Sequence, residues 1–321
     1  MHSFKELSST FATHFNTSHF PKEPQTLYAA NDYFLGLGGK RIRPVMCLIG
    51  NELFDEIHAD AWHVATAIEL FHNFTLIHDD IMDAAPLRRG LETVHYKYGS
   101  NTALLAGDVM LVVAYEYLNK INSSYLKHII NIFSKTAKEV CEGQQLDMDF
   151  EKLPAVSLSD YLKMIELKTS VLLAASLKMG AIIGGAGEGN QDHLYEFGKN
   201  LGIAFQIQDD YLDAFGDPEK VGKTAGGDIK QNKKTFLLIH ALETASTDQQ
   251  KELNELLHTN AEDKVQRVLK IFRDCNADDW AKKLKQEYFT KALNHLDEIA
   301  VLSARKKPLT EIADFLIQRD Y

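Results

Sequence analysis

Residues 61–83 read AWHVATAIELFHNFTLIHDDIMD, and this stretch carries the first indication of the fold. Its apolar side chains recur at roughly the spacing of a helix, so Ala61–Met82 is predicted to form one long helix. The same pattern predicts further helices over Thr102–Leu118, Leu158–Ile183, Asp192–Phe215 and Lys234–Glu243. From residue 246 on, the sequence is more polar and favours amphipathic surface helices.

The scarcity of proline agrees with this pattern. The chain of 321 residues has 7 prolines, and after Pro44 they occur only at positions 86, 154, 218 and 308. Because proline interrupts helices, the long stretches without it can be helical throughout. A β-protein would show turn-forming residues about every 8–12 residues, and these are missing. We therefore expect an all-α chain that forms a single domain over residues 1–321.

Composition and charge narrow the class of protein. Hydrophobic residues at 45% and charged residues at 25% exclude intrinsic disorder. The net charge of −10 argues against a nucleic-acid partner, because phosphate backbones bind basic surfaces. The first residues do not resemble a signal peptide, and the longest apolar stretch, Val171–Gly187, is too short and too rich in glycine to span a membrane. We expect this stretch to be a buried core helix and the protein to be cytoplasmic.

The three cysteines, Cys47, Cys141 and Cys275, lie far apart and have no metal-ligand spacing. Each is expected to behave as a small buried hydrophobic residue in a reducing compartment.

Two clusters of aspartate are the strongest chemical signal. Asp79-Asp-Ile-Met-Asp83 ends one long helix, and Asp209-Asp-Tyr-Leu-Asp213 ends another. In each cluster the first and last aspartates share one helix face, where they repel each other and oppose the helix dipole. Such unfavourable placements are typical of functional sites. Because Mg²⁺ binds carboxylates together with substrate phosphates, the pair predicts a diphosphate held through several Mg²⁺ ions. A solvated acidic helix end is the alternative for either cluster alone.

Basic residues match the anion that these clusters predict. Arginine pairs bind phosphate in a bidentate manner, and glycines let the backbone approach an anion closely. An ordinary charged surface is the alternative for each group, and we retain it for Lys234. The basic segments are Gly38-Gly-Lys-Arg-Ile-Arg-Pro44, Arg88-Arg89, Lys168-Thr169, Lys223 and Lys233-Lys234.

In this order the motifs resemble those of the trans-isoprenyl diphosphate synthases, also called polyprenyl synthetases. Residues 79–90 resemble the first aspartate-rich motif of that family, residues 209–218 the second, and residues 38–44 its N-terminal substrate motif. Lys168-Thr169, Phe205-Gln206, Lys223 and Gly227-Asp-Ile follow in the family's order. The resemblance implies a single helical bundle around a deep central cavity, with both aspartate motifs at its mouth. It also implies a homodimer.

The activity implied is Mg²⁺-dependent, head-to-tail condensation of isopentenyl diphosphate with an allylic prenyl diphosphate. No side chain stands out as the base for the final proton loss, and the resemblance implies that the departed diphosphate takes the proton. The residues implied are, for catalysis, Asp79, Asp80, Asp83, Asp209, Asp210, Asp213 and Lys168; for the metal, Asp79, Asp83 and Asp209; for the allylic diphosphate, Arg88, Lys168, Thr169, Gln206, Lys223 and Lys233; and for isopentenyl diphosphate, Gly39, Lys40, Arg43, His72 and Arg89.

The length of the product is expected to depend on side chains one to two turns before Asp79. Phe71, Phe74 and Thr75 form the predicted floor for the growing chain, although Phe71 and Phe74 as ordinary core residues are the alternative. A bulky aromatic residue at position 74 is similar to short-chain synthases that make the C20 product geranylgeranyl diphosphate, with C15 farnesyl diphosphate as the alternative. His78 is expected to be a packed helical histidine.

Three other classes remain as alternatives. A helical metal-dependent phosphohydrolase built on His78-Asp79 would leave the second aspartate cluster unexplained. A terpene cyclase commonly replaces one of the two clusters and lacks an isopentenyl site. An inactive subunit of a heteromeric synthase usually loses one cluster, whereas both are complete here.

Overall fold

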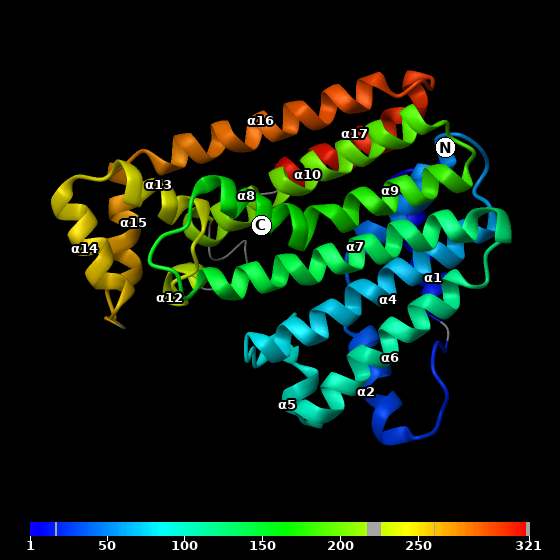
Figure 1. Cartoon of the computed structure of the whole chain (residues 1–321), viewed down its shortest axis with the longest axis horizontal. Coiled ribbons are helices and arrows are strands. Elements are labelled where there is room, and N and C mark those ends of the chain that lie inside the picture. Colours follow the sequence, from blue (N-terminus) through cyan, green and yellow to red (C-terminus); the bar gives the residue numbers. More distant parts are fainter. Residues whose placement is uncertain (17, 217–225, 260, 319–321) are drawn as a thin grey trace. The chain divides into compact units, whose positions relative to one another are not determined.

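The computed structural model describes residues 1–16, 18–216, 226–259 and 261–318 (Figure 1). In this part of the chain helices dominate, and the strands are one short antiparallel hairpin of β1 (Leu87–Arg88) and β2 (Leu91–Glu92). The all-α fold class is therefore confirmed. The helices are α1 (Phe4–Phe15), α2 (Gln25–Gly36), α3 (Ile42–Glu52), α4 (Ala59–Met82), α5 (Val94–Tyr98), α6 (Ser100–Leu118), α7 (Ser123–Phe150), α8 (Leu158–Ile165), the π turn η1 (Glu166–Ser170), α9 (Val171–Ile183), α10 (Glu188–Phe215), α12 (Gly227–Lys230), α13 (Phe236–Thr244), α14 (Thr247–Leu257), α15 (Lys264–Asp274), α16 (Ala277–Glu298) and α17 (Ser303–Gln318).

The helices predicted from apolar periodicity are all present, although several begin or end up to four residues from the predicted bounds and one is interrupted. The predicted helix Ala61–Met82 is α4, which begins two residues earlier because the His58 ring accepts a hydrogen bond from the Asp60 amide. The stretch Leu158–Ile183 is interrupted by the π turn η1 between α8 and α9. A π turn shifts the helix face by one residue. Because α9 is buried on nearly all sides, it has no apolar stripe in which periodicity could reveal this shift.

The chain groups into two compact units. Unit 1 comprises Met1–Phe133, Ser176–Gln191 and Val301–Pro308, and unit 2 comprises Ser134–Ala175, Asp192–Ala300 and the chain from Leu309 on. Helices α7, α9, α10 and α17 contribute residues to both units. The single domain and the central cavity stay predictions.

In unit 1, α4 packs along α6 and against α3, and Figure 1 shows α4 and α6 side by side. Aromatic rings fill the space beside α4, since the Phe71 ring meets the Phe133 ring edge-on at 5.3 Å. Helices α3 and α9 approach so closely that a Cβ on Gly50 would lie 2.5 Å from the Leu177 carbonyl oxygen. The aspartate-bearing helix α4 is thus held by apolar packing on several sides.

The apolar stretch from Val171 forms α9, in which every residue except Lys178 is buried, as predicted for a core helix. None of the helices that the structure describes is long and apolar enough to cross a membrane.

The expectation for the cysteines is correct only for Cys47, which is buried. Cys141 is exposed and Cys275 is partly exposed. Cys141 and its neighbour Glu142 are both exposed on the polar face of the amphipathic helix α7. The position of a cysteine on its helix, which the residue type alone does not reveal, therefore decides whether it is buried.

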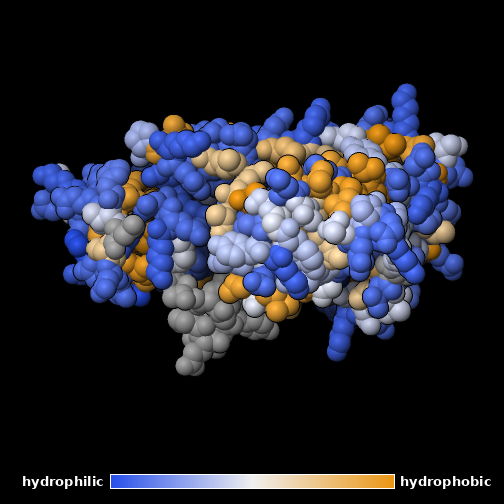
Figure 2. Space-filling model, turned by 90° about the horizontal axis from the view of Figure 1, so that it is seen from below, coloured by the Kyte–Doolittle hydropathy of each residue, from blue (hydrophilic) through white to orange (hydrophobic). Residues whose placement is uncertain are grey.

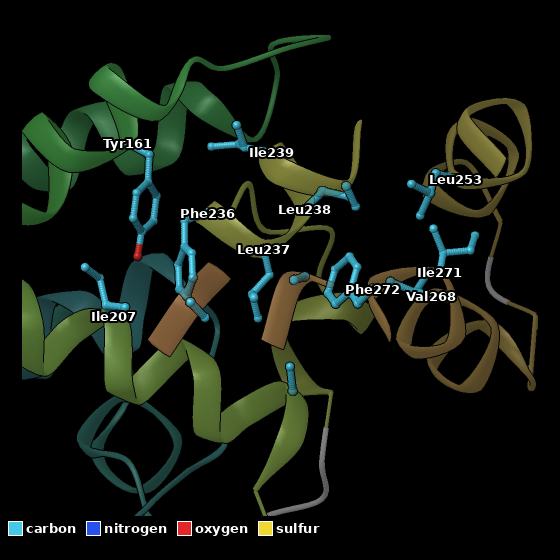
Figure 3. Close-up of a cluster of buried hydrophobic side chains, with 14 of the residues drawn as sticks. Tyr161, Ile207, Phe236, Leu237, Leu238, Ile239, Leu253, Val268, Ile271 and Phe272 are labelled. Carbon is cyan, nitrogen blue, oxygen red and sulfur yellow. The ribbon is translucent and has the colours of Figure 1, made fainter. Parts of the chain in front are cut away.

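Unit 2 has its own apolar core, shown in Figure 3. Helix α13 contributes Phe236 and its neighbours, and α15 contributes Val268, Ile271 and Phe272. The Tyr161 ring of α8 lies 5.8 Å from the Phe236 ring, with its hydroxyl directed toward α10, the helix that carries Ile207 (Figure 3). The tyrosine thus links this core to polar groups on α10.

Candidate active site

The first aspartate motif lies at the C-terminal end of α4, in unit 1. Asp79 is partly buried, Asp80 is 2% exposed and Asp83 is exposed. Asp83 is the helix C-cap, and the next residue, Ala84, has a left-handed φ of 48°. The amides of Ala84 and Ala85 close the helix by donating to the carbonyls of Ile81 and Asp80, which is the Schellman arrangement.

The buried member of this motif is bound to an arginine. Arg88, from the hairpin that follows α4, donates from Nε to both carboxylate oxygens of Asp80 at 2.9 Å, and its Nη2 lies 2.8 Å from Oδ1. Asp80 therefore orients Arg88, whereas Asp79 and Asp83 flank it on the more exposed side of the helix end.

The residues predicted to bind isopentenyl diphosphate gather in the same unit. Arg43 Nη1 lies 3.1 Å from His72 Nε2, and its buried Nε has no hydrogen-bond partner. A Cβ on Gly39 would lie 3.1 Å from the Arg89 guanidinium, so a side chain at this position would press against that group. Burial, followed by the charges of Arg43 and Arg89, holds the pKa of His72 well below its ordinary value. Lys40 is exposed on the same loop. Arg43 and Arg89 therefore lie close to a neutral His72, Gly39 lies against Arg89, and Lys40 follows Gly39 in the chain.

The second aspartate motif lies near the C-terminal end of α10, in unit 2. Asp209 is exposed, Asp210 is 8% exposed and Asp213 is partly buried. Asp210 accepts hydrogen bonds from the Tyr161 hydroxyl at 2.7 Å and from Gln206 Nε2 at 2.9 Å. Burial and the nearby Asp228 carboxylate raise the pKa of Asp210 to about 7. As in the first motif, the middle aspartate is the buried one and is bound by protein groups.

The π turn presents Lys168 and Thr169 in the same unit. Lys168 Nζ donates to Asp147 Oδ2 at 2.5 Å, and Thr169 Oγ1 donates to Gln206 Oε1 at 3.2 Å. Thr169 is thereby linked through Gln206 to Asp210. The backbone at Lys168 also touches Gly143 of α7 so closely that a side chain there would overlap it. π turns are frequent at functional sites because they rotate side chains out of the regular helix pattern.

Of the lysines that follow the second motif, Lys223 and Lys233 are predicted site residues and Lys234 is expected to be ordinary charged surface. Lys233 Nζ lies 3.9 Å from Asp228 Oδ1, and the Asp228 amide donates to Asp213 Oδ2 at 3.0 Å. Lys233 is therefore part of the group around the second motif. Lys234 is partly buried, and burial lowers its pKa. Lys223 lies outside the described residues.

Of the predicted chain-length residues, Phe71 and Phe74 are buried in unit 1, and Thr75 is partly buried. Phe71 is 1% exposed and Phe74 is 8% exposed, and their rings lie 5.6 Å apart. Thr75 donates its hydroxyl to the His72 carbonyl. His78 packs as expected, since its ring meets that of Phe74 at 4.7 Å and its Nε2 lies 3.1 Å from the Leu104 carbonyl oxygen.

Sequence reasoning missed several of these contacts. Asp147 and Tyr161 are single residues on helices with no motif around them, although each holds a predicted site residue. Asp228 was noted only as part of Gly227-Asp-Ile. Glu69 is 3% exposed on α4 and is paired with Arg41, whereas the sequence shows only that an acidic residue lies in an apolar stretch. Such partners become apparent only when the helices are packed.

The donor chemistry of the two motifs fits Mg²⁺. Each offers hard carboxylate oxygens at the more exposed positions, Asp79 and Asp83 in one unit and Asp209 in the other, while the middle aspartate is engaged by the protein. A cation bound by one or two carboxylates keeps open positions for water and phosphate oxygens, which is the coordination Mg²⁺ prefers. Among the described residues no group of three or more His, Cys, Asp and Glu side chains is already gathered for a metal. A ligand that brings phosphate oxygens would complete such a site.

Comparisons with known proteins agree with these features. Residues 24–274 match the family model described as Polyprenyl synthetase. The chain is 41% identical over 304 residues to the geranylgeranyl pyrophosphate synthase of Geoglobus acetivorans, covering 94% of this chain and 93% of that protein. It is 34% identical over 319 residues to the geranylfarnesyl diphosphate synthase of Natronomonas pharaonis, covering 94% and 92%. It is also similar to a crystal structure of a geranylgeranyl pyrophosphate synthase, with a TM-score of 0.95, 44% identity and 99% of both chains covered. The chain belongs to the polyprenyl synthetase family.

Proposed function

We propose that this protein is a prenyltransferase that condenses isopentenyl diphosphate with allylic diphosphates, head to tail and with Mg²⁺, to give geranylgeranyl diphosphate. The observation that carries the proposal is the shared construction of the two aspartate motifs. In each, the middle aspartate is bound to the protein and the outer ones are more exposed, beside cationic groups predicted to hold phosphate. Relatives named geranylgeranyl synthases support the class of product.

The chain's own residues have distinct tasks in this reaction. Asp79, Asp83 and Asp209 hold the Mg²⁺ ions, which when bound draw electrons toward the leaving diphosphate. Lys168 and Lys233 add positive charge where negative charge develops on that diphosphate. Arg88, Thr169, Gln206 and Lys223 complete the proposed set around the allylic diphosphate, while Asp80, Asp210 and Asp213 keep the motif ends in place.

Isopentenyl diphosphate is proposed to bind to the cluster of Gly39, Lys40, Arg43, His72 and Arg89. The unpartnered Nε of Arg43 is a donor that a diphosphate oxygen would satisfy. A neutral His72 adds no charge of its own, so the arginines and Lys40 supply the attraction. Because the double bond of this substrate attacks a carbocation, apolar side chains rather than water must surround the reacting carbons. The departed diphosphate is the proposed acceptor of the final proton.

Product length is proposed to be set at Phe74, one turn before Asp79, with Phe71 and Thr75 beside it. The aromatic pair Phe71 and Phe74 is well packed, and a growing chain would stop against it. This supports C20, while C15 stays the alternative. A relative named as a geranylfarnesyl synthase shows that longer products also occur among similar chains.

A homodimer in the cytoplasm completes the proposal. Helix α6 exposes three apolar side chains, Leu104, Leu105 and Val112, which lie on one helix face. The face of the molecule in Figure 2 carries apolar patches among polar side chains. A second copy that covers this helix face would remove it from water. The wide separation of the three cysteines supports a reducing compartment.

One assay tests the proposed function. The purified chain is incubated with isopentenyl diphosphate, Mg²⁺ and in turn dimethylallyl, geranyl or farnesyl diphosphate, and the products are separated by chromatography. Geranylgeranyl diphosphate from all three starters supports the proposal. A cyclic hydrocarbon made without isopentenyl diphosphate favours a terpene cyclase, and no turnover by the single chain favours an inactive subunit.

A further inference from the structure

Glu69 is a buried carboxylate that the proposed chemistry does not use. Its side chain is 5% exposed on α4, where it accepts hydrogen bonds from Arg41 Nη1 and, at 3.1 Å, from Asn73 Nδ2. Taking a carboxylate out of water is costly, and an apolar residue would fill this helix position more cheaply if packing were its only task. The buried charge of Glu69 therefore indicates a task other than packing.

The Glu69 carboxylate holds Arg41, the residue at the start of α3, in place. Its backbone is left-handed, with φ 51° and ψ 32°, and it forms the N-cap of α3. A non-glycine residue adopts this conformation only when its surroundings impose it. The Arg41 side chain is 9% exposed, lies 4.9 Å over the Phe15 ring and is paired with Glu69. The ion pair thus ties the start of α3 to the middle of α4.

This tie sets the geometry of the neighbouring cationic residues. Arg43 follows Arg41 by two positions, and His72 lies on the same face of α4 as Glu69, one turn further along. The Arg43–His72 distance of 3.1 Å consequently depends on the same junction of α3 with α4 that Arg41 and Glu69 form. Burial lowers the pKa of both Arg43 and Arg89, and the Glu69 charge offsets part of this lowering, so it stabilises both cations.

We infer that Glu69 is a positioning residue for isopentenyl diphosphate. Through Arg41 it fixes the loop of residues 38–41 and the start of α3, so that Gly39, Lys40 and Arg43 meet the diphosphate together with His72 and Arg89. This inference rests on the proposed function. It predicts that loss of the Glu69 charge weakens the binding of isopentenyl diphosphate but leaves the binding of the allylic diphosphate unchanged, because the allylic diphosphate is assigned to different residues.

The test compares Glu69→Gln with the wild type in steady-state kinetics. The KM for isopentenyl diphosphate is expected to rise about tenfold, while kcat and the KM for farnesyl diphosphate change by less than about twofold. Calorimetric titration of the protein with isopentenyl diphosphate alone is expected to show the same weakening. Arg41→Gln should raise the KM for isopentenyl diphosphate in the same way. The double variant should show no larger rise in this KM than the more affected single variant, because both changes break one contact. Arg41→Gln also serves if Glu69→Gln does not fold.

Glu52→Gln is the matched control, since Glu52 is another buried glutamate of unit 1, paired with the N-terminal segment. It should leave both KM values unchanged. Equal rises in both KM values for Glu69→Gln, or a lowered melting temperature with unchanged KM values, would overturn the inference. If the wild type itself makes no lengthened product, the proposed function fails instead, whatever the variants do.

Discussion

The hydroxyl of Tyr161 donates a 2.7 Å hydrogen bond to Oδ2 of Asp210, while Gln206 donates to the other oxygen. Both oxygens of this carboxylate are thereby engaged by the protein. In unit 1 the Arg88 guanidinium engages both oxygens of Asp80 in the same way. Each motif thus has an anchoring aspartate in the middle, and the metal ligands that we propose, Asp79, Asp83 and Asp209, lie at more exposed outer positions.

Tyr161→Phe should loosen the second motif. The change removes one donor from a buried carboxylate, which should lower the free energy of unfolding by about 1–3 kcal/mol. We also expect kcat to fall, because the end of α10 no longer holds Asp209 in one orientation. Urea unfolding and kinetics at saturating Mg²⁺ measure the two effects. Tyr288→Phe, in a partly buried tyrosine on α16, is the control and should change neither. Full activity of Tyr161→Phe would mean that the anchor is dispensable.

Asp79→Ala and Asp209→Ala should each lower kcat by about 10²-fold or more, because charge stabilisation at a developing anion contributes several kcal/mol. The exposed Asp248 of α14 provides the control, and Asp248→Ala should retain wild-type turnover. Titration with Mg²⁺ should show weaker activation of both motif variants. A near-wild-type rate in either variant would contradict the mechanism with two aspartate motifs.

Phe74→Ala should lengthen the product, because it removes the proposed floor one turn before Asp79. Chromatography of the products reads chain length independently of yield, so the expected loss of stability, about 3–5 kcal/mol for a buried phenylalanine, does not obscure the result. Phe11→Ala removes an equally buried ring from α1 and should leave product length unchanged. An unaltered product from Phe74→Ala would show that this ring is only part of the core.

Stability should decrease below about pH 6.5, with His19 as one cause. Burial, followed by the charge of Lys120, lowers the pKa of His19, whose ring contacts the Tyr117 hydroxyl and the Phe15 carbonyl. His14 adds to this lowering, while Asp32 opposes it. As the pH falls, His19 therefore binds a proton more readily in the unfolded chain than in the folded chain. The contribution of His19 to the free energy of unfolding is fully present above the unfolded pKa and is lost as the pH falls toward the folded pKa. Urea unfolding at about pH 7 and pH 5 should show a smaller loss for His19→Gln than for the wild type. An identical loss in both proteins would exclude His19 as a cause.

Helix positions were predictable from the sequence because burial of one face imposes a period on apolar residues. The π turn η1, which presents Lys168 and Thr169, is not predictable in this way, because the helix that follows it is buried on nearly all sides and has no apolar stripe. The first and second aspartate motifs were recognised from their spacing alone. Their anchors were not, because Tyr161 and Gln206 meet Asp210 from α8 and from within α10, and only packing in three dimensions brings Tyr161 there.

Burial was also difficult to predict for charged residues. Glu69 and Asp80 are acids in or beside apolar stretches, and each is buried and paired with an arginine from another element, Arg41 at the start of α3 or Arg88 of the hairpin after α4. The sequence shows both partners of each pair but not the pairing. Cys141 shows the opposite error, since a residue type that is usually buried lies on an exposed helix face.

The central claim is that bond formation consumes isopentenyl diphosphate as diphosphate leaves the allylic substrate. The most direct measurement follows both events in one reaction, with labelled isopentenyl diphosphate, farnesyl diphosphate and Mg²⁺. We predict that one diphosphate is released for each isopentenyl unit incorporated into geranylgeranyl diphosphate, and that neither event occurs without Mg²⁺. Release of phosphate or diphosphate with no incorporation of label would contradict the account and identify a hydrolase or a cyclase.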